Sequence, residues 1–194
     1  GEKVKEYISK NKIFEASVLK ESSLEDDRKA LVQTIGENIQ IRRVVTLEFD
    51  SSMNIGIYIH SDSKLGSLVV TKDGNDEIAK DIAMHVSAFN PLCLSHDDID
   101  KDVLEREKAI YQNQAQDSGK PQDIMDKMVD GKVKRFLSEV SLISQNFVKD
   151  PDITVQEYLE KGGATIVEFA RLKVGEGIEV ETKDFAEEVA EQLK

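Results

Sequence analysis

The chain has 194 residues, of which 39% are hydrophobic and 33% are charged, and 38 acidic residues against 26 basic ones give a net charge of −12 at pH 7. This balance argues against direct binding of nucleic acid or of an anionic membrane, because either would need a dominant basic patch. The single Cys93 allows neither an internal disulfide nor a cysteine-based zinc site. With no long apolar run and no secretory signal at the start, these features predict a soluble, cytoplasmic globular protein.

The first thirty-five residues are predicted to be helical. Val4 and Ile8 recur at helical spacing, and Ser22 stands three residues before Glu25, the arrangement of a capping box that opens a second helix. Gly36 can adopt the left-handed conformation that ends such a helix.

After Gly36 the hydrophobic period changes from that of a helix to that of a strand. Three short runs rich in β-branched residues, at 39–49, 55–60 and 65–71, are separated by polar turns. They predict three strands with tight antiparallel connections. A helix over residues 78–89 follows and is expected to cover the sheet.

From residue 100 the chain becomes more highly charged and forms two long amphipathic segments, joined by a short connection at residues 119–121. Such a connection forces two helices to lie antiparallel, so we predict a projecting helical hairpin. Beyond it, a second capping box at residues 154–157 and a strand at 164–174 resume the globular pattern, and a helix through residues 185–193 closes the chain. The hairpin is therefore an insertion into an α+β fold.

The sequence offers little that could carry out catalysis. The Gly175-Glu176-Gly177 turn lacks the third glycine and the following helix of a dinucleotide site, and the consecutive residues His96, Asp97 and Asp98 point in different directions. His85 lies on the apolar face of its helix, which favours a buried, hydrogen-bonded histidine, and Cys93 is expected to pack as a small hydrophobic residue. We therefore predict no catalytic residue, metal site or cofactor. A metal-dependent enzyme around His60, His85 and His96 is the alternative.

Surfaces that contact other proteins are the remaining candidates. His60 ends the run Ile57-Tyr58-Ile59-His60 beside a turn, where an aromatic side chain and an imidazole are exposed together. A residue at the end of a loop is a reasonable contact candidate.

Several longer strings are recognisable and occur in a fixed order along most of the chain: TIGENIQIRR at 34–43, IAMHV at 82–86, SGKP at 118–121, MVDGK at 128–132, EVSL at 139–142, QNFV at 145–148 and RLKVGEGIE at 171–179. Together they resemble the translation elongation factor Ts family, of the bacterial type. The resemblance implies a nucleotide exchange factor whose partner is elongation factor Tu. It also implies a core of two small antiparallel-sheet subdomains with covering helices and an inserted antiparallel coiled coil.

The same resemblance implies a division of the chain. It assigns residues 1–50 to the remainder of the first core subdomain, residues 51–97 and 142–182 to the second, residues 98–141 to the inserted coiled-coil hairpin and residues 183–194 to a C-terminal helix.

Two partner-binding residues can be carried over from the family, Ile35 in the Ile-Gly-Glu-Asn string and His60 in the Tyr-x-His string. The family's N-terminal helical module and its Thr-Asp-Phe-Val motif, which wedges near the magnesium site of the GTPase, have no match in this sequence. We therefore expect an N-terminally truncated factor that binds elongation factor Tu without efficient exchange.

Two further expectations concern association. A strand at 39–49 that lacks its family neighbours would present an unpaired edge, which predicts homodimerisation or other self-association. The alternative function is that of a helical-hairpin interaction or dimerisation module, with the main partner bound along residues 104–140 and no exchange activity.

Overall fold

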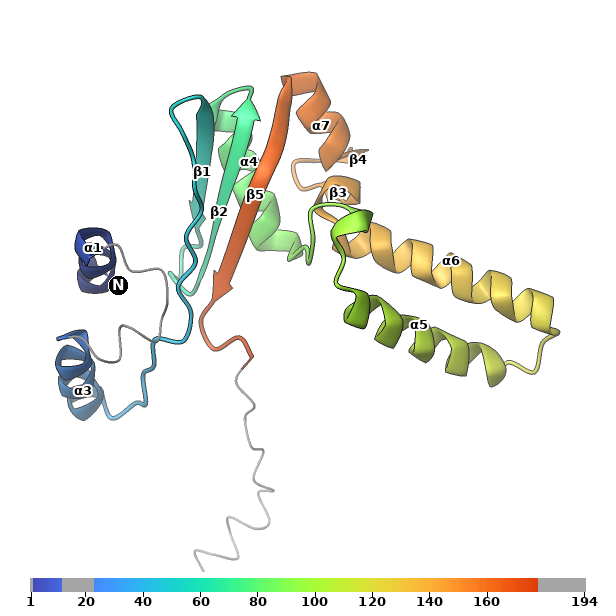
Figure 1. Ribbon diagram of the computed structural model, residues 1–194, viewed down its shortest axis with the longest axis horizontal. Helices are drawn as coiled ribbons and strands as arrows, with labels where there is room; N and C mark the ends of the chain where they lie inside the picture. Colours follow the sequence, from blue (N-terminus) through green and yellow to red (C-terminus); the bar gives the residue numbers. More distant parts are fainter. Residues whose placement is uncertain (1, 12–22, 178–194) are drawn as a thin grey trace, which may run out of the picture. The chain divides into compact units, whose positions relative to one another are not determined.

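A computed structural model describes residues 2–11 and 23–177 of the chain (Figure 1). The chain divides into two compact units, Gly1–Met53 and Asn54–Lys194, which are described separately. Helices combine with two antiparallel sheets, so the predicted α+β class is confirmed. Among the described residues no helix is both long enough and apolar enough to cross a bilayer.

The first unit contains helices α1 (Glu2–Asn11) and α3 (Leu24–Ile35). Leu24 is its buried centre, and the partly buried residues packed against it are Val4, Tyr7, Ile8, Ile41 and Val44. Helix α3 ends as the sequence predicts, because Gly36 adopts a left-handed φ of 72° and its N–H donates to the carbonyl of Val32. The helix begins at Leu24, after Ser23, whose side chain makes no capping hydrogen bond, while Ser22, the expected capping residue, lies outside the described residues.

The predicted strand at 39–49 is wrong. These residues are described, but they follow an irregular path and none belongs to a strand. A strand persists only when its backbone groups pair with a neighbour, and the described residues before Met53 contain no strand that could provide one. The expectation of self-association through an unpaired edge of this strand therefore loses its basis.

The second unit is built on a three-stranded sheet of β1 (Met53–Ile59), β2 (Leu65–Asp73) and β5 (Ala164–Lys173), in the order β1-β2-β5. Strands β2 and β5 pair antiparallel from Leu65 opposite Lys173 to Asp73 opposite Ala164, with a register shift between Val70 and Thr71. The third strand of the sheet, β5, therefore lies about ninety residues beyond β2 in the sequence, after the hairpin.

Helix α4 (Asp76–Phe89) covers one face of this sheet, as predicted (Figure 1). Asn75 caps its start by accepting a hydrogen bond from the Ile78 N–H, and Asn90 ends it in the left-handed conformation. The core between helix, sheet and the elements that follow the hairpin consists of Val69, Ile78, Ile82, Ala83, Val86, Leu142, Phe147, Val155, Leu159, Ala164 and Ile166.

Helices α5 (Lys101–Gln116) and α6 (Gln122–Val140) form the predicted hairpin and extend together away from the sheet (Figure 1). Their connection includes Gly119 at a positive φ of 63°. Ala115 and Val129 are the buried residues of the pair. Most other positions are partly or fully exposed, as expected for two helices that bury one narrow stripe against each other.

Short elements connect the hairpin to the last strand. The 3-10 turns η1 (His96–Asp98) and η2 (Leu142–Ser144) lie at its two ends, and a ribbon of β3 (Asn146–Phe147) and β4 (Asp150–Thr154) leads into α7 (Val155–Gly162). The capping box predicted for α7 is present, with Thr154 and Glu157 bonded reciprocally. The ribbon was not predicted, and the expected C-terminal helix at 183–194 lies outside the described residues.

Candidate functional site

Ile35 is the last residue of α3, in the first unit, and is 48% exposed. Leu31, one helical turn earlier, is 49% exposed. Residues four apart lie on the same face of a helix, so these two side chains form an exposed apolar strip that ends at Gly36. Leu24 is the buried residue of α3, so the apolar side chains at the end of the helix remain accessible.

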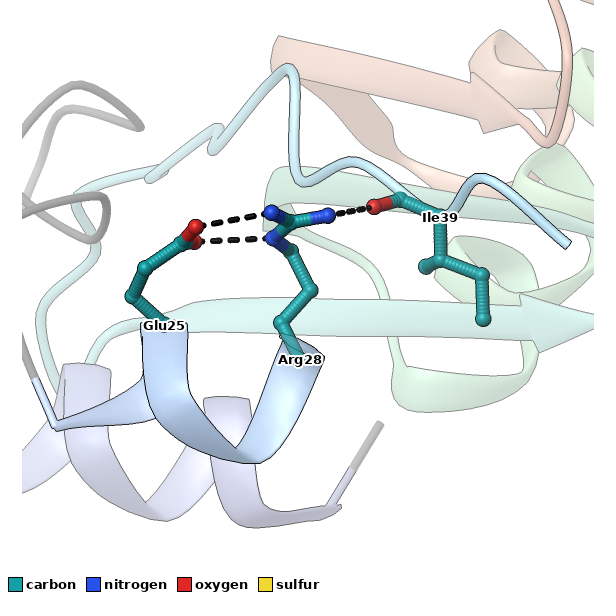
Figure 2. A network of polar contacts seen from close by, with 3 residues as sticks. All are labelled: Glu25, Arg28 and Ile39. Carbon is teal, nitrogen blue, oxygen red and sulfur yellow. Dashed lines mark hydrogen bonds and ion pairs between the residues drawn. The ribbon is translucent and has the colours of Figure 1, made fainter. Parts of the chain in front are cut away.

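An ion pair fixes the segment that follows this strip. Figure 2 shows the Arg28 guanidinium donating two hydrogen bonds to the Glu25 carboxylate, at 2.8 and 2.7 Å, and a third to the Ile39 carbonyl at 2.6 Å. The bond to Glu25 raises the pKa of Arg28 above its usual value. Because one planar guanidinium joins α3 to residue 39, it sets the path of the chain just beyond Ile35 and Gly36.

His60, in the second unit, directly follows β1 at a tight turn. Its N–H donates to the Leu65 carbonyl at 2.9 Å, and its own carbonyl accepts from the Ser63 N–H at 2.8 Å. Its Nδ1 lies 2.9 Å from Asp62 Oδ1, and the imidazole is 47% exposed. The pKa of Asp62 is lowered, first by the hydrogen bond from the Lys64 N–H and then by the contact with His60. The turn therefore holds an exposed imidazole in a defined orientation.

Apolar side chains surround this end of the sheet. Ile59, just before His60, is 66% exposed. Val174 is 69% exposed and lies at the same end, because its N–H donates to the Lys64 carbonyl at 2.8 Å. An imidazole beside exposed aliphatic side chains is suited to contact with a protein partner.

The other two histidines considered from the sequence, His85 and His96, are hydrogen-bonded to side chains of the same chain. His85 is fully buried and hydrogen-bonded, as predicted, and Cys93 is buried as well. His96 Nε2 lies 3.1 Å from the Ser144 hydroxyl, while Asp98 completes a capping box with Ser95. In residues 2–11 and 23–177 no three potential metal-binding side chains cluster together.

The chain is similar to known proteins over most of its length. The family profile described as "Elongation factor TS" matches residues 2–176 of the chain. The chain belongs to the elongation factor Ts family. The elongation factor Ts of Hahella chejuensis (strain KCTC 2396) is 50% identical over 183 residues, which cover 94% of this chain and 63% of that protein. That of Francisella tularensis subsp. novicida (strain U112) is 48% identical over 170 residues, or 88% and 57%. The chain thus spans less than two thirds of the length of these relatives.

This member of the elongation factor Ts family also contains a polar cluster that the sequence did not reveal. Asp81 of α4 accepts from Lys149 Nζ at 2.6 Å with one carboxylate oxygen and from the Tyr158 hydroxyl at 2.9 Å with the other. Burial, with a smaller effect from the Asp81 bond, raises the pKa of Tyr158 to about 12. These contacts tie α4 to the ribbon and to α7, so they support the scaffold on which His60 is presented.

Because His85 is buried, we predict that the stability of this chain depends on pH. Burial lowers the pKa of His85 below its ordinary value of about 6.5, although the bond to Gln145 opposes the shift. The unfolded chain therefore takes up this proton first, and the free energy of unfolding should decrease as the pH falls from about 6.5 towards the folded-state pKa. Each unit by which the pKa is lowered corresponds to about 1.4 kcal/mol.

Urea unfolding between pH 5 and 8, followed by circular dichroism, measures this slope. His85→Leu should be less stable at pH 7 but lose less stability on acidification. Val129→Ala, which truncates a buried residue of α6 without an ionisable group, should also be less stable at pH 7 but keep the wild-type slope. A wild-type slope in H85L would show that other groups cause the acid sensitivity.

Proposed function

We propose that this chain binds elongation factor Tu and takes part in guanine nucleotide exchange in the cytoplasm. The observation that carries the proposal is membership of the elongation factor Ts family over residues 2–176. The exposure of Ile35 and His60, the two contact residues that the family resemblance implies, supports it.

The proposed mechanism is differential binding and requires no covalent chemistry. The factor stabilises a shape of the GTPase that holds phosphate and Mg²⁺ weakly, so bound GDP leaves and another nucleotide enters. The coupling is reciprocal: nucleotide weakens the binding of the factor by the same ratio as the factor weakens the binding of nucleotide. A thousandfold acceleration of GDP release requires a barrier lower by only about 4 kcal/mol.

In this mechanism the two exposed residues have different roles. Ile35, with Leu31, would insert an aliphatic strip into an apolar recess of the partner. His60 would meet the partner through Nε2 and the ring face, because Nδ1 is already engaged with Asp62. Since the 194 residues contain no Thr-Asp-Phe-Val string, we further propose that this chain binds well but accelerates exchange weakly.

Binding of the chain to purified elongation factor Tu, with and without GDP, tests this proposal directly. We expect a complex that excess GDP weakens, and a release of fluorescent GDP that is accelerated much less than by the longer elongation factor Ts of Hahella chejuensis. I35A and H60A should each weaken the complex about five- to thirtyfold, an effect of about 1–2 kcal/mol. V45A, which truncates an exposed aliphatic residue outside both contact positions, serves as the matched control.

The possible outcomes distinguish the exchange function, the weak acceleration by this chain and the alternative of a hairpin interaction module. Absence of any complex, or a complex indifferent to GDP, would overturn the exchange function. Full acceleration by the 194-residue chain would contradict only the weak-exchange part. If removal of residues 98–140 abolished binding while I35A and H60A left it intact, the chain would act as a helical-hairpin interaction module instead.

A further inference from the structure

The two ends of the inserted hairpin are joined to each other where they leave the core. The Leu92 N–H donates to the Val140 carbonyl at 2.8 Å, and the Leu142 N–H donates to the Cys93 carbonyl at 2.9 Å. Cys93 and Ser141 thereby form a parallel bridge, and the thiol lies 3.4 Å from the Ser141 hydroxyl. This clamp holds the entry and exit of the hairpin together. It does not fix the direction in which α5 and α6 extend relative to α4, which other contacts must determine.

The side chain of Gln145 provides a contact between the hairpin and α4. Its Nε2 donates to the Glu139 carbonyl, in the last turn of α6, at 2.6 Å. Its Oε1 lies 2.9 Å from His85 Nε2, in α4. The Gln145 carbonyl accepts from the Val155 N–H at 2.9 Å, so its backbone is tied to the start of α7. Gln145 is 5% exposed, and water therefore cannot easily replace these bonds.

His85 is held so that it can only donate to Gln145. Its Nδ1 accepts a hydrogen bond from the Val148 N–H at 3.2 Å, which places the ring proton of the neutral imidazole on Nε2. The ring is stacked on Phe89 at 4.7 Å and lies 6.0 Å from the Phe147 ring, between centroids. The chain of donors thus runs in one direction, from Val148 to His85, from His85 to Gln145 and from Gln145 to Glu139.

We propose that Gln145 is the positioning residue that fixes the direction of the α5–α6 hairpin relative to the sheet. An amide suits this role because it accepts from one helix and donates to the other at the same time. Rotating the amide by 180° would set donor against donor at His85 and acceptor against acceptor at Glu139, so one orientation is strongly favoured. The inference concerns the chain alone and does not depend on the proposed function.

The variant Gln145→Met tests the proposal, because it keeps the length of the side chain and removes both hydrogen bonds. Spin labels at Lys72→Cys in β2 and Ser118→Cys at the hairpin connection, both exposed positions, report the distance between sheet and hairpin end. Cys93 is buried and retained, and mass spectrometry checks that two labels are attached. Gln156→Met, at an exposed position in α7, is the matched control.

We expect the Q145M distance distribution to be at least twice as wide as that of the wild type, while Q156M leaves it unchanged. Hydrogen exchange of the β2 and α4 amides should stay close to wild type, which separates loss of direction from general unfolding. A Q145M distribution as narrow as the wild-type one would overturn the proposal.

A second measurement applies if Q145M fails to fold. In the wild-type protein, the Gln145 side-chain amide protons should exchange with solvent at least tenfold more slowly than those of Gln156, whose amide bonds to Glu160 at the surface. Equal exchange rates at the two side chains would show that the Gln145 bonds do not persist in solution, and the proposal would fail.

Discussion

Replacing Gly56 with alanine should destabilise the second unit by about 3 kcal/mol, the upper end of the usual cost of overpacking. A Cβ atom at Gly56 in β1 would lie 1.9 Å from the Ala79 carbonyl oxygen and 2.6 Å from the Lys80 nitrogen. These are backbone atoms of α4, so no side-chain rotation relieves the overlap, and the helix must move away from the sheet. Because the sequence contains no Trp, urea unfolding followed by circular dichroism is the measurement.

Gly131→Ala is the control for this substitution. Gly131 lies inside α6, and a Cβ there would meet nothing within 4 Å. Alanine should therefore stabilise the helix by about 0.5–1 kcal/mol, the opposite sign to the effect at Gly56. A G56A protein as stable as the wild type would mean that α4 packs farther from β1 than the structure places it.

The second large effect is expected at Phe147, in the two-residue strand β3. Its ring is 2% exposed and stacks on Tyr158 at a centroid distance of 4.0 Å, on the side of α7, while His85 of α4 lies 6.0 Å away. Phe147→Ala removes the ring at the point where three elements meet, and should cost about 3–5 kcal/mol of unfolding free energy. Thermal and urea unfolding monitor the loss.

Two further variants test whether the loss of stability in F147A comes from the central position of the Phe147 ring. Phe147→Leu keeps most of the volume and should cost less than about 1.5 kcal/mol. Phe89→Ala removes a ring that also stacks on His85 but is 48% exposed, so its effect should be clearly smaller than that of F147A. Equal losses for F89A and F147A would contradict the central position assigned to Phe147.

The local pattern of hydrophobic residues was sufficient to predict most helices and strands of the second unit. The β-branched runs at 55–60 and 65–71 correspond to β1 and β2, and the apolar spacing after Asp76 corresponds to α4. These predictions succeed because each element buries one face, so its hydrophobic period is set by its own structure. The hairpin was predictable for the same reason, together with its short connection.

The hydrophobic pattern failed to predict elements whose structure depends on pairing with a segment distant in the sequence. Residues 39–49 have the composition of a strand, but composition cannot provide a pairing partner. The β3–β4 ribbon was missed for the opposite reason, because a two-residue strand and a strand containing Pro151 carry almost no periodic signal.

The candidate contact residues were predictable only in part. Ile35 of the first unit and His60 of the second came from the family resemblance, and the sequence pattern suggested exposure of His60 alone. The bond between His85 and Gln145 joins residues 60 positions apart, and that between Asp81 and Tyr158 joins residues 77 positions apart. No local spacing encodes such pairs, because they are created by the return of the chain after the insertion.

The bridge between Cys93 and Ser141 has a consequence for how this fold can diversify. Since the backbone enters and leaves the insertion at neighbouring points, turns can be gained or lost at the far end of α5 and α6 without altering how the rest of the chain closes. The length of the α5–α6 hairpin can therefore change in evolution independently of the core, so a chain with a longer or shorter hairpin can keep the same core.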